Sequence, residues 1–221
     1  MKRILRDNGL SIAVFGLFIL FLIGESIAGH RANNEDRREH ALPPVSYLEF
    51  IASGDFIEST AENWESEFLE MAAYALFTAV LFQKGSAESK KIGVPEQVDR
   101  DPRLSRHKQN APWPVRRGGW ALRVYENSLS VAFLLLFLSA FLLHAWGGMQ
   151  AYNEQQAAHG GSADSLFQFM SSWQFWFQSL QNWQSEFLGL GSMIVLSIFL
   201  RQRGSPESKP VDAAHSDTGS G

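Results

Sequence analysis

The sequence predicts an all-α protein, a four-helix transmembrane bundle built from two parallel two-helix repeats, with amphipathic helices in the outer loops. Three observations predict this fold. The apolar residues are gathered in a few long runs, these runs recur at a constant spacing, and Lys and Arg are concentrated on one side of them. Although 45% of the 221 residues are hydrophobic, polar loops separate the apolar runs, so average hydropathy gives no evidence for a soluble protein.

The two most apolar runs predict transmembrane helices over about 9–29 and 127–147. Each is close to the roughly 20 residues that an α-helix needs to cross a hydrocarbon core. Each contains a single ionisable side chain, Glu25 in the first and His144 in the second.

Two shorter apolar runs follow Trp64 and Trp183. Taken alone, each fits either a transmembrane helix or a buried helix of a soluble domain. Counted from the tryptophan, which favours the membrane interface, each run becomes long enough to cross. The sequence therefore predicts two further spans, over about 64–83 and 183–201.

An internal duplication is indicated by two pairs of motifs. NWESEFL and NWQSEFL begin at Asn63 and Asn182, and GSAESK and GSPESK begin at Gly85 and Gly204, both pairs being separated by 119 residues. Shared positions of the first motif include Asn63, Trp64, Ser66, Glu67, Asn182, Trp183, Ser185 and Glu186. Because each copy holds two spans, both copies enter the membrane in the same orientation, related by a pseudo-twofold axis along its normal.

The duplication defines the predicted organisation of the chain. Repeat unit 1 covers residues 1–90, a linker covers 91–120, and repeat unit 2 covers 121–209. The polar composition of residues 210–221 predicts a disordered tail. The first helix resembles a secretory signal, but its internal counterpart at 127–147 favours its retention.

Basic residues set the predicted orientation. Three precede the first helix, ten lie between Lys84 and Arg123, and three follow the last span, whereas the loop after the third span has none. The positive-inside rule therefore places both termini and the linker in the cytoplasm. Arg116, Arg117 and Arg123 act either as simple topology determinants or as a site for anionic lipid headgroups, beside two tryptophans.

Capping boxes begin a second helical element in both outer loops. Ser46 is followed three residues later by a Glu, and Ser165 by a Gln, which predicts helices from about 46 and from about 165. Aromatic residues at helical spacing place these helices in the outer headgroup layer or over the mouth of the bundle. Ser53 and Gly54 are expected to break the first of them.

Glu67 and Glu186 are equivalent residues of the two repeats and the first candidates for a proton or cation path. Ionisable groups in a span are costly and often mark such paths. The alternative is structural, because a carboxylate in the first turn of a helix is stabilised by the helix dipole. Glu25 and His144 are also equivalent, and either face each other across the pseudo-axis or extend to water at the interface.

No other chemistry is indicated. The chain has no cysteine, and His30, His40 and His159 do not have the spacing of a metal motif. The formal charge of −4 is mild and no nucleic-acid motif is present, so no nucleic-acid partner is expected. We therefore expect no catalytic residue, no cofactor and no enzymatic activity.

The paired NWxSEFL and GSxESK motifs resemble those of an uncharacterised bacterial membrane-protein family classed as a domain of unknown function. The resemblance covers most of the chain and implies a small multi-pass protein of the bacterial inner membrane. It transfers no activity or site residue.

Two functions are expected from the residues themselves. The first is a non-enzymatic component that binds the lipid bilayer or another membrane protein. The alternative is a transporter or channel module for protons or cations, which would be oligomeric because one four-helix chain leaves little room for a pore.

Overall fold

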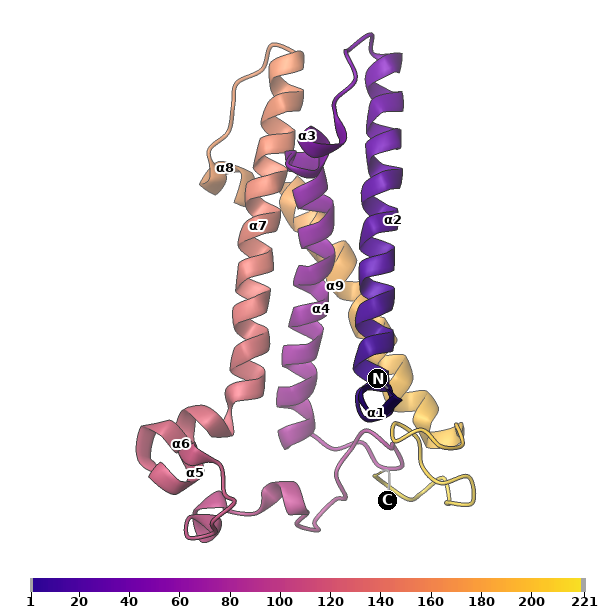
Figure 1. Ribbon diagram of the computed structural model, residues 1–221, viewed down its shortest axis with the longest axis vertical. Coiled ribbons are helices and arrows are strands. Elements are labelled where there is room, and N and C mark those ends of the chain that lie inside the picture. Colours follow the sequence, from indigo (N-terminus) through magenta and orange to yellow (C-terminus); the bar gives the residue numbers. More distant parts are fainter. Residues whose placement is uncertain (1, 220–221) are drawn as a thin grey trace. The chain divides into compact units, whose positions relative to one another are not determined.

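The computed structural model describes residues 2–219, and these residues form helices and loops without any strand (Figure 1). The expected all-α class is confirmed. The chain divides into two compact units, one formed by residues 1–61 and 143–175 and the other by residues 62–142 and 176–221. Helices α4, α7 and α9 contribute residues to both units.

Two helices among the described residues are long and apolar enough to cross a membrane, α2 (Gly9–Glu39) and α7 (Ser128–Ala158). Each has 31 residues, and they contain the two most apolar runs of the sequence. Helices α4 (Gly54–Val80) and α9 (Trp173–Phe199) do not meet the same criterion. The physical reason in α4 is a high density of acidic side chains, namely Asp55, Glu58, Glu62, Glu65, Glu67 and Glu70.

The helices of the first half recur in the second half with the same lengths. Helices α3 (Tyr47–Ile51) and α8 (Leu166–Met170) have five residues each, and α4 and α9 have 27 each. In all three pairs, α2 with α7, α3 with α8 and α4 with α9, both ends are displaced by 119 residues. The offset found in the sequence motifs therefore also describes the helix boundaries.

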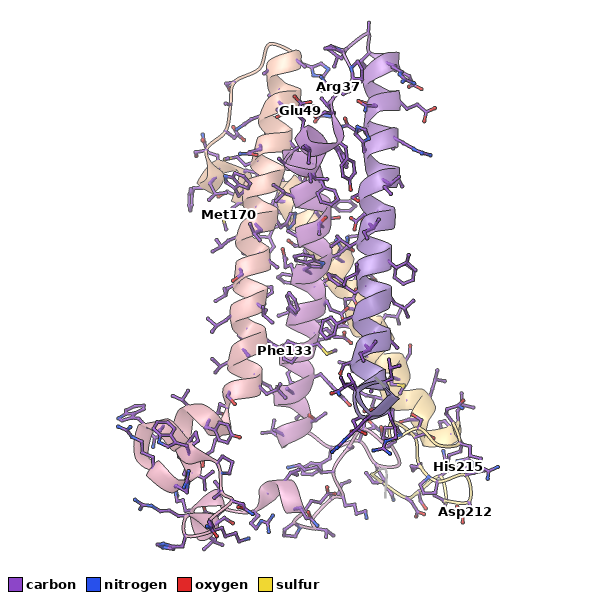
Figure 2. The ribbon with its side chains drawn as sticks, in the orientation of Figure 1. Arg37, Glu49, Phe133, Met170, Asp212 and His215 are labelled. Atoms are coloured by element: carbon purple, nitrogen blue, oxygen red, sulfur yellow. The ribbon has the colours of Figure 1, made fainter. Side chains whose placement is uncertain are left out.

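Both capping boxes of the outer loops are present. The hydroxyl of Ser46 accepts a hydrogen bond from the Glu49 amide, and that of Ser165 accepts one from the Gln168 amide. In return, the side chains of Glu49 and Gln168 each accept a hydrogen bond from the backbone amide of the serine. Figure 2 shows Glu49 close to Arg37, near the loop after α2. The Ser46 amide and hydroxyl, with a smaller contribution from Arg37, lower the pKa of Glu49.

The short helices α3 and α8 are followed by a break, and α4 and α9 then begin earlier than expected. The sequence predicted helices from about 64 and 183, whereas α4 begins at Gly54 and α9 at Trp173. The correction has a local cause: the hydroxyl of Ser53 accepts from the Phe56 amide, and that of Ser172 accepts from the Phe175 amide. Each serine satisfies a free amide of a first helical turn, so it starts a new helix.

Glycines allow close packing in the unit formed by residues 1–61 and 143–175. A Cβ on Gly54 would lie 2.6 Å from the Gly147 carbonyl oxygen, and one on Gly148 would lie 2.7 Å from the ring of Phe169. The equivalent contact in the first half is between Gly29 and Phe50, at 2.9 Å. Helix α4 therefore begins against the backbone of α7, where only glycine fits.

The predicted linker, residues 91–120, contains short helical segments, the last of which extends past its end. These are the 3-10 helices η1 (Gln97–Asp99) and η2 (Pro102–Ser105), and the α-helices α5 (Trp113–Arg117) and α6 (Gly119–Glu126). One further short helix, α1 (Lys2–Asp7), precedes α2. Pro102 and Pro114 occupy first-turn positions, where proline is compatible with a helix.

The tail is ordered through residue 219, which corrects the prediction of disorder from residue 210; residues 220 and 221 lie outside the described part of the chain. The ammonium of Lys209 is buried and donates to four backbone oxygens, those of Gly85, Ala214, His215 and Asp217, at 2.6–3.2 Å. Figure 2 labels His215, whose Nδ1 also lies 3.1 Å from the Ile198 oxygen. These bonds hold a polar segment that composition alone predicts to be free.

Candidate functional site

Three carboxylates converge in the unit formed by residues 62–142 and 176–221. One oxygen from each of Glu67, Glu70 and Glu186 lies within 4.8 Å of the others, a separation at which they could hold a metal ion. Glu70 is only 8% exposed, Glu186 is half-buried and Glu67 is exposed. None of the three forms an ion pair with a described residue. We call these three residues the glutamate cluster.

The cluster lies in the middle of long helices. Glu67 is thirteen residues after Gly54, where α4 begins, and Glu186 is thirteen residues after Trp173, where α9 begins. The expectation that both lie in the first turn of a helix is therefore wrong. A helix dipole acts within the first turn, so it cannot stabilise these two carboxylates.

Like charges this close repel strongly when they are away from bulk water. The cluster therefore favours states in which its charge is reduced. Carboxylate oxygens are the usual ligands of hard cations, and a proton shared between two of the oxygens would serve the same purpose. The arrangement can thus bind a proton or a cation.

Another glutamate of α4, two residues before Glu67, is fully buried. Glu65 is 0% exposed, and its Oε1 accepts a hydrogen bond of 2.8 Å from Nε1 of Trp183. The Trp183 ring also contacts Phe137 and Trp176, with ring centroids 6.0 and 6.2 Å apart. These contacts fix one face of α9 beside α4.

The other residues of the NWxSEFL motif either form hydrogen bonds within their own helices or are partly exposed. The Ser66 hydroxyl is buried and donates to the Asn63 oxygen at 2.8 Å, and the Asn182 amide donates to the Gln178 oxygen at 3.3 Å. Ser185 is exposed and Trp64 is half-buried. The motif therefore contributes its glutamates and Trp183 to the site, and Asn63, Ser66 and Asn182 to the helices that carry it.

Glu25 and His144 occupy different environments. The Glu25 side chain is exposed, whereas His144 is completely buried, with its ring 4.8 Å from the ring of Phe175. The exposure of Glu25 fits the alternative of extension to water, whereas the burial of His144 does not. Burial, which depends on neighbouring helices, differs between these two positions although they are 119 residues apart like the motifs.

The basic residues near the linker lie on short helices with exposed tryptophans. The guanidinium of Arg117 lies 5.2 Å from the centre of the Trp113 ring, and that of Arg123 lies 5.2 Å from the centre of the Trp120 ring. Arg116 is exposed on the same helix as Arg117. Beneath them, Val115 and Leu122 are buried and anchor α5 and α6.

The repeated motif predicted Glu67 and Glu186 as site residues, whereas Glu70 was not predicted. The repeat itself conceals Glu70, because the equivalent position of the second half is Gly189. Its helical spacing of three residues from Glu67 is the signal that places both on one face of α4. No metal site was predicted from the sequence, and carboxylates that come from two helices have no motif spacing that would indicate one.

Comparison with known proteins assigns the chain to a family. The model of a family described as a domain of unknown function, DUF6766, matches residues 1–220. The chain belongs to this family. No curated protein and no solved structure matches it. Membership covers almost the whole chain, and it confirms the expected assignment to a domain of unknown function without supplying an activity.

Proposed function

We propose that the protein is a multi-pass membrane protein of the bacterial inner membrane, with α2, α4, α7 and α9 as its four spans. The apolar character of α2 and α7 supports two of these spans. The matching ends of α4 and α9, and their 27-residue lengths, support an internal duplication that adds one span to each half. The uneven distribution of Lys and Arg supports cytoplasmic termini.

Within this topology, the protein binds and conducts protons or cations through the glutamate cluster. One observation carries this proposal: Glu67 and Glu186, from helices far apart in sequence, converge with Glu70 within 4.8 Å. Three carboxylates inside the membrane, two on α4 and one on α9, need a positive counter-charge, because an isolated charge there is costly. A single copy offers few helices to line a path, so the proposed conducting form is a homo-oligomer.

Flux measurements on the full-length protein in liposomes test this proposal. An internal pH dye reports proton entry driven by a potassium diffusion potential, and the same vesicles are then tested with sodium and potassium gradients. We expect flux from the wild type and its loss in the double variant Glu67→Gln, Glu186→Gln. The matched control is Glu154→Gln, an exposed carboxylate of α7 outside the cluster.

Two results would contradict the proposal. One is flux in the double variant equal to that of the wild type, which would reject the cluster as the carrier. The other is a wild type with no more flux than vesicles without protein. Size-exclusion chromatography of both variants verifies that the substitutions do not alter folding.

A second function, binding of anionic lipid, is favoured by the surface of α5 and α6. Trp113 is 57% exposed and Trp120 is 75% exposed, each with an arginine stacked on its ring. Exposed Trp with Arg is the combination found at the headgroup layer of a membrane. On this proposal the protein is a non-enzymatic component that the cytoplasmic leaflet holds through Arg116, Arg117 and Arg123.

Lipid selectivity tests the second function. The protein in nanodiscs of phosphatidylcholine alone, or with phosphatidylglycerol added, is compared by the quenching of tryptophan fluorescence by headgroup-labelled lipid. We expect stronger quenching with phosphatidylglycerol, and loss of that difference in the triple variant Arg116→Gln, Arg117→Gln, Arg123→Gln. Equal quenching in both lipids by the wild type would reject the proposal.

A further inference from the structure

A polar cavity of about 1050 Å³ lies at the C-terminal end of α4, within a single unit of the chain. Ala75 and Thr78 line it from the helix, and the turn at 87–91 and the segment 94–99 line other sides. A cavity of this size can hold a small molecule. Its charged lining residues, four acids and two bases, are Glu88, Lys90, Lys91, Glu96, Asp99 and Glu207.

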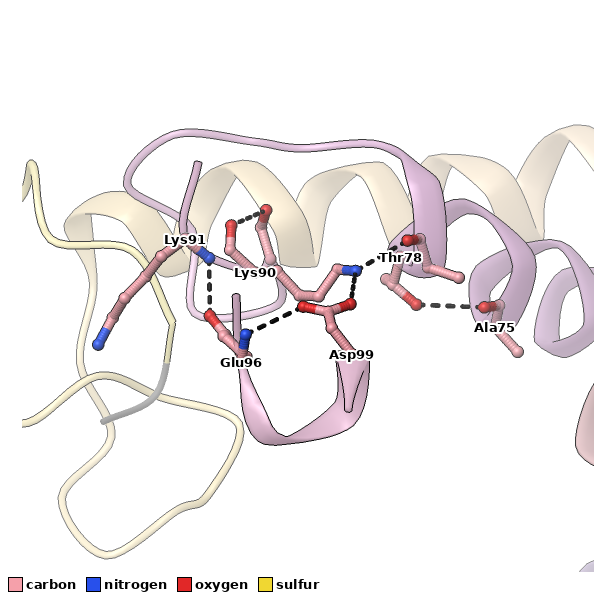
Figure 3. Close-up of polar contacts among 8 residues, drawn as sticks. Ala75, Thr78, Lys90, Lys91, Glu96 and Asp99 are labelled. Atoms are coloured by element: carbon pink, nitrogen blue, oxygen red, sulfur yellow. Dashed lines mark hydrogen bonds and ion pairs between the residues drawn. The ribbon is translucent and has the colours of Figure 1, made fainter. Parts of the chain in front are cut away.

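One acid and one base of this lining neutralise each other. Figure 3 shows the ammonium of Lys90 between α4 and Asp99, and it donates to the Ala79 oxygen at 2.9 Å and to Asp99 Oδ1 at 2.7 Å. The Glu96 side chain accepts a hydrogen bond of 2.8 Å from the Lys91 amide, which holds the same wall. With Lys90 and Asp99 paired, three carboxylates and the ammonium of Lys91 remain, so the cavity keeps an excess of negative charge.

Two of the remaining carboxylates are equivalent positions of the GSxESK motif. Glu88 and Glu207 are 119 residues apart, and each follows a glycine in the left-handed region, Gly85 with φ 86° and Gly204 with φ 88°. In each copy the glutamate amide donates to the hydroxyl of the motif's first serine, at 3.1 and 3.2 Å. The same turn therefore brings a glutamate to this one cavity from both repeats.

Glu88 and Glu207 form no ion pair within the part of the chain that the structure describes. The hydroxyl of Tyr74 donates a hydrogen bond to Oε2 of Glu88. The other oxygen, Oε1, is buried and has no hydrogen-bond partner among the described residues. Buried carboxylate oxygens are normally satisfied, so an unsatisfied one in the wall of a polar cavity points to a donor that comes from outside the chain.

The distribution of the acids and the rest of the lining indicate the kind of donor. Among the described residues, three acidic ligands converge within 4.8 Å only in the glutamate cluster, so the acids of this cavity do not surround a single metal ion. Much of the remaining lining is aliphatic, namely Ala75, Ala79, Ala87, Val94, Pro95 and Val98. Separated carboxylates with aliphatic surface match a molecule whose ammonium groups are joined by methylene chains.

We propose that this cavity binds an aliphatic polyamine, with one ammonium group on Glu88 and a second on Glu207. An ammonium group carries three donors and a positive charge, so it supplies both the hydrogen bond that Oε1 of Glu88 lacks and the counter-charge. The methylene groups contact the alanine and valine side chains and leave no polar group unsatisfied. The site shares no residue with the glutamate cluster, so it goes beyond the function proposed for that cluster.

Calorimetric titration of the full-length protein with spermidine, in a nonionic detergent, tests the proposal. The cavity variant is Glu88→Gln with Glu207→Gln, in which each side chain keeps its shape and an oxygen that can accept from Tyr74. We expect its affinity to be about tenfold lower or more, because charge-assisted hydrogen bonds are lost. The control variant is Glu35→Gln with Glu154→Gln, two exposed acids that are also 119 residues apart and lie outside the cavity. It removes the same charge and should bind as the wild type does.

Two further ligands distinguish a polyamine from other cations. Butylamine has a single ammonium group, and we expect it to bind at least tenfold more weakly than spermidine, since it reaches only one of the two glutamates. Magnesium chloride should displace spermidine no better than sodium chloride at the same ionic strength, because screening then acts alone. Size-exclusion chromatography verifies that the cavity variant is folded. The single variants Glu88→Gln and Glu207→Gln, each expected to lose part of the affinity, replace it if it is not.

The outcomes separate this site from the glutamate cluster. Weaker spermidine binding in the cavity variant, with normal binding in the control variant, supports the polyamine site. Four results overturn it: no saturable binding by the wild type, wild-type affinity in the cavity variant, equal affinity for butylamine, or binding that is lost in Glu67→Gln with Glu186→Gln instead. Absence of proton or cation flux in liposomes would reject the function of the cluster and leave the polyamine site intact.

Discussion

The indole Nε1 of Trp183 donates a hydrogen bond of 2.8 Å to Oε1 of Glu65, a carboxylate that is completely buried. The two residues come from the two copies of one motif, but they are not equivalent positions, since Glu65 corresponds to Gln184 and Trp183 to Trp64. The contact therefore joins α4 to α9 beside the glutamate cluster and sets how these two helices meet.

Loss of the Trp183 donor is expected to destabilise the protein. Trp183→Phe keeps an aromatic ring but removes the hydrogen bond to Glu65. We expect the free energy of unfolding to fall by about 1–3 kcal/mol, because a buried acceptor loses one of its donors. Glu65→Gln retains an oxygen that can accept the same bond, so we expect a smaller effect. Thermal unfolding in detergent measures both. A larger effect from Glu65→Gln would show that the carboxylate charge, and not this bond, matters most.

Gly54→Ala is expected to disturb the contact between the start of α4 and α7. The added methyl group would lie 2.6 Å from backbone atoms of Gly147 and Ala151, which cannot move aside like a flexible side chain. We expect a loss of about 1–3 kcal/mol in the free energy of unfolding, as for other overpacked sites. Gly16→Ala is the control, since nothing lies within 4 Å of its Cβ. Similar unfolding midpoints for both variants would contradict the contact.

Lys209→Met is expected to release the tail. The substitution keeps an unbranched side chain but removes all four hydrogen bonds to backbone oxygens. Hydrogen exchange of residues 210–219, measured by mass spectrometry, should become about tenfold faster or more, because local opening no longer breaks these bonds. Lys84→Met, at an exposed lysine, should leave exchange unchanged. Unchanged protection in Lys209→Met would assign the order of the tail to other contacts.

Acid is expected to loosen the segment around Asp99. The hydrogen bond from Lys90, followed by that from the Glu96 amide, lowers the pKa of Asp99 in the folded state. This stabilisation is complete above about pH 4, where Asp is ionised in the unfolded chain as well. It is lost as the pH falls through the lowered pKa, because the unfolded state then binds the proton more readily.

Because the chain has no cysteine, a single spin label can report this change. Gln97→Cys carries the label on η1, and we expect its mobility to rise as the solution is acidified below about pH 4. In Asp99→Asn the mobility should be high at neutral pH and insensitive to acid. A label that stays immobile in Asp99→Asn would exclude the Lys90–Asp99 contact as the cause.

The elements that could be predicted from sequence are those set by local patterns. The capping serines Ser46 and Ser165 mark helix starts, because a cap depends on residues three positions apart. Glu67 and Glu186 could be named as candidates because the motif repeats. The beginning of α4 at Gly54 was missed, since the second cap, at Ser53, resembles a simple break. The order of the tail was also missed, because it depends in part on hydrogen bonds to Gly85, which is more than a hundred positions away from Lys209 and Thr218.

From the amino-acid sequence alone, it could be predicted that this protein is helical, which of its runs are most apolar, and that its motifs recur at a spacing of 119 residues. These properties follow from local periodicity and composition. The folded chain was needed to show that Glu70 joins Glu67 and Glu186, that Glu25 and His144 differ in burial, and that Tyr74 donates a hydrogen bond to Glu88. Such relationships depend on how side chains from distant helices and turns meet, and packing breaks the equivalence that the repeated sequence suggests.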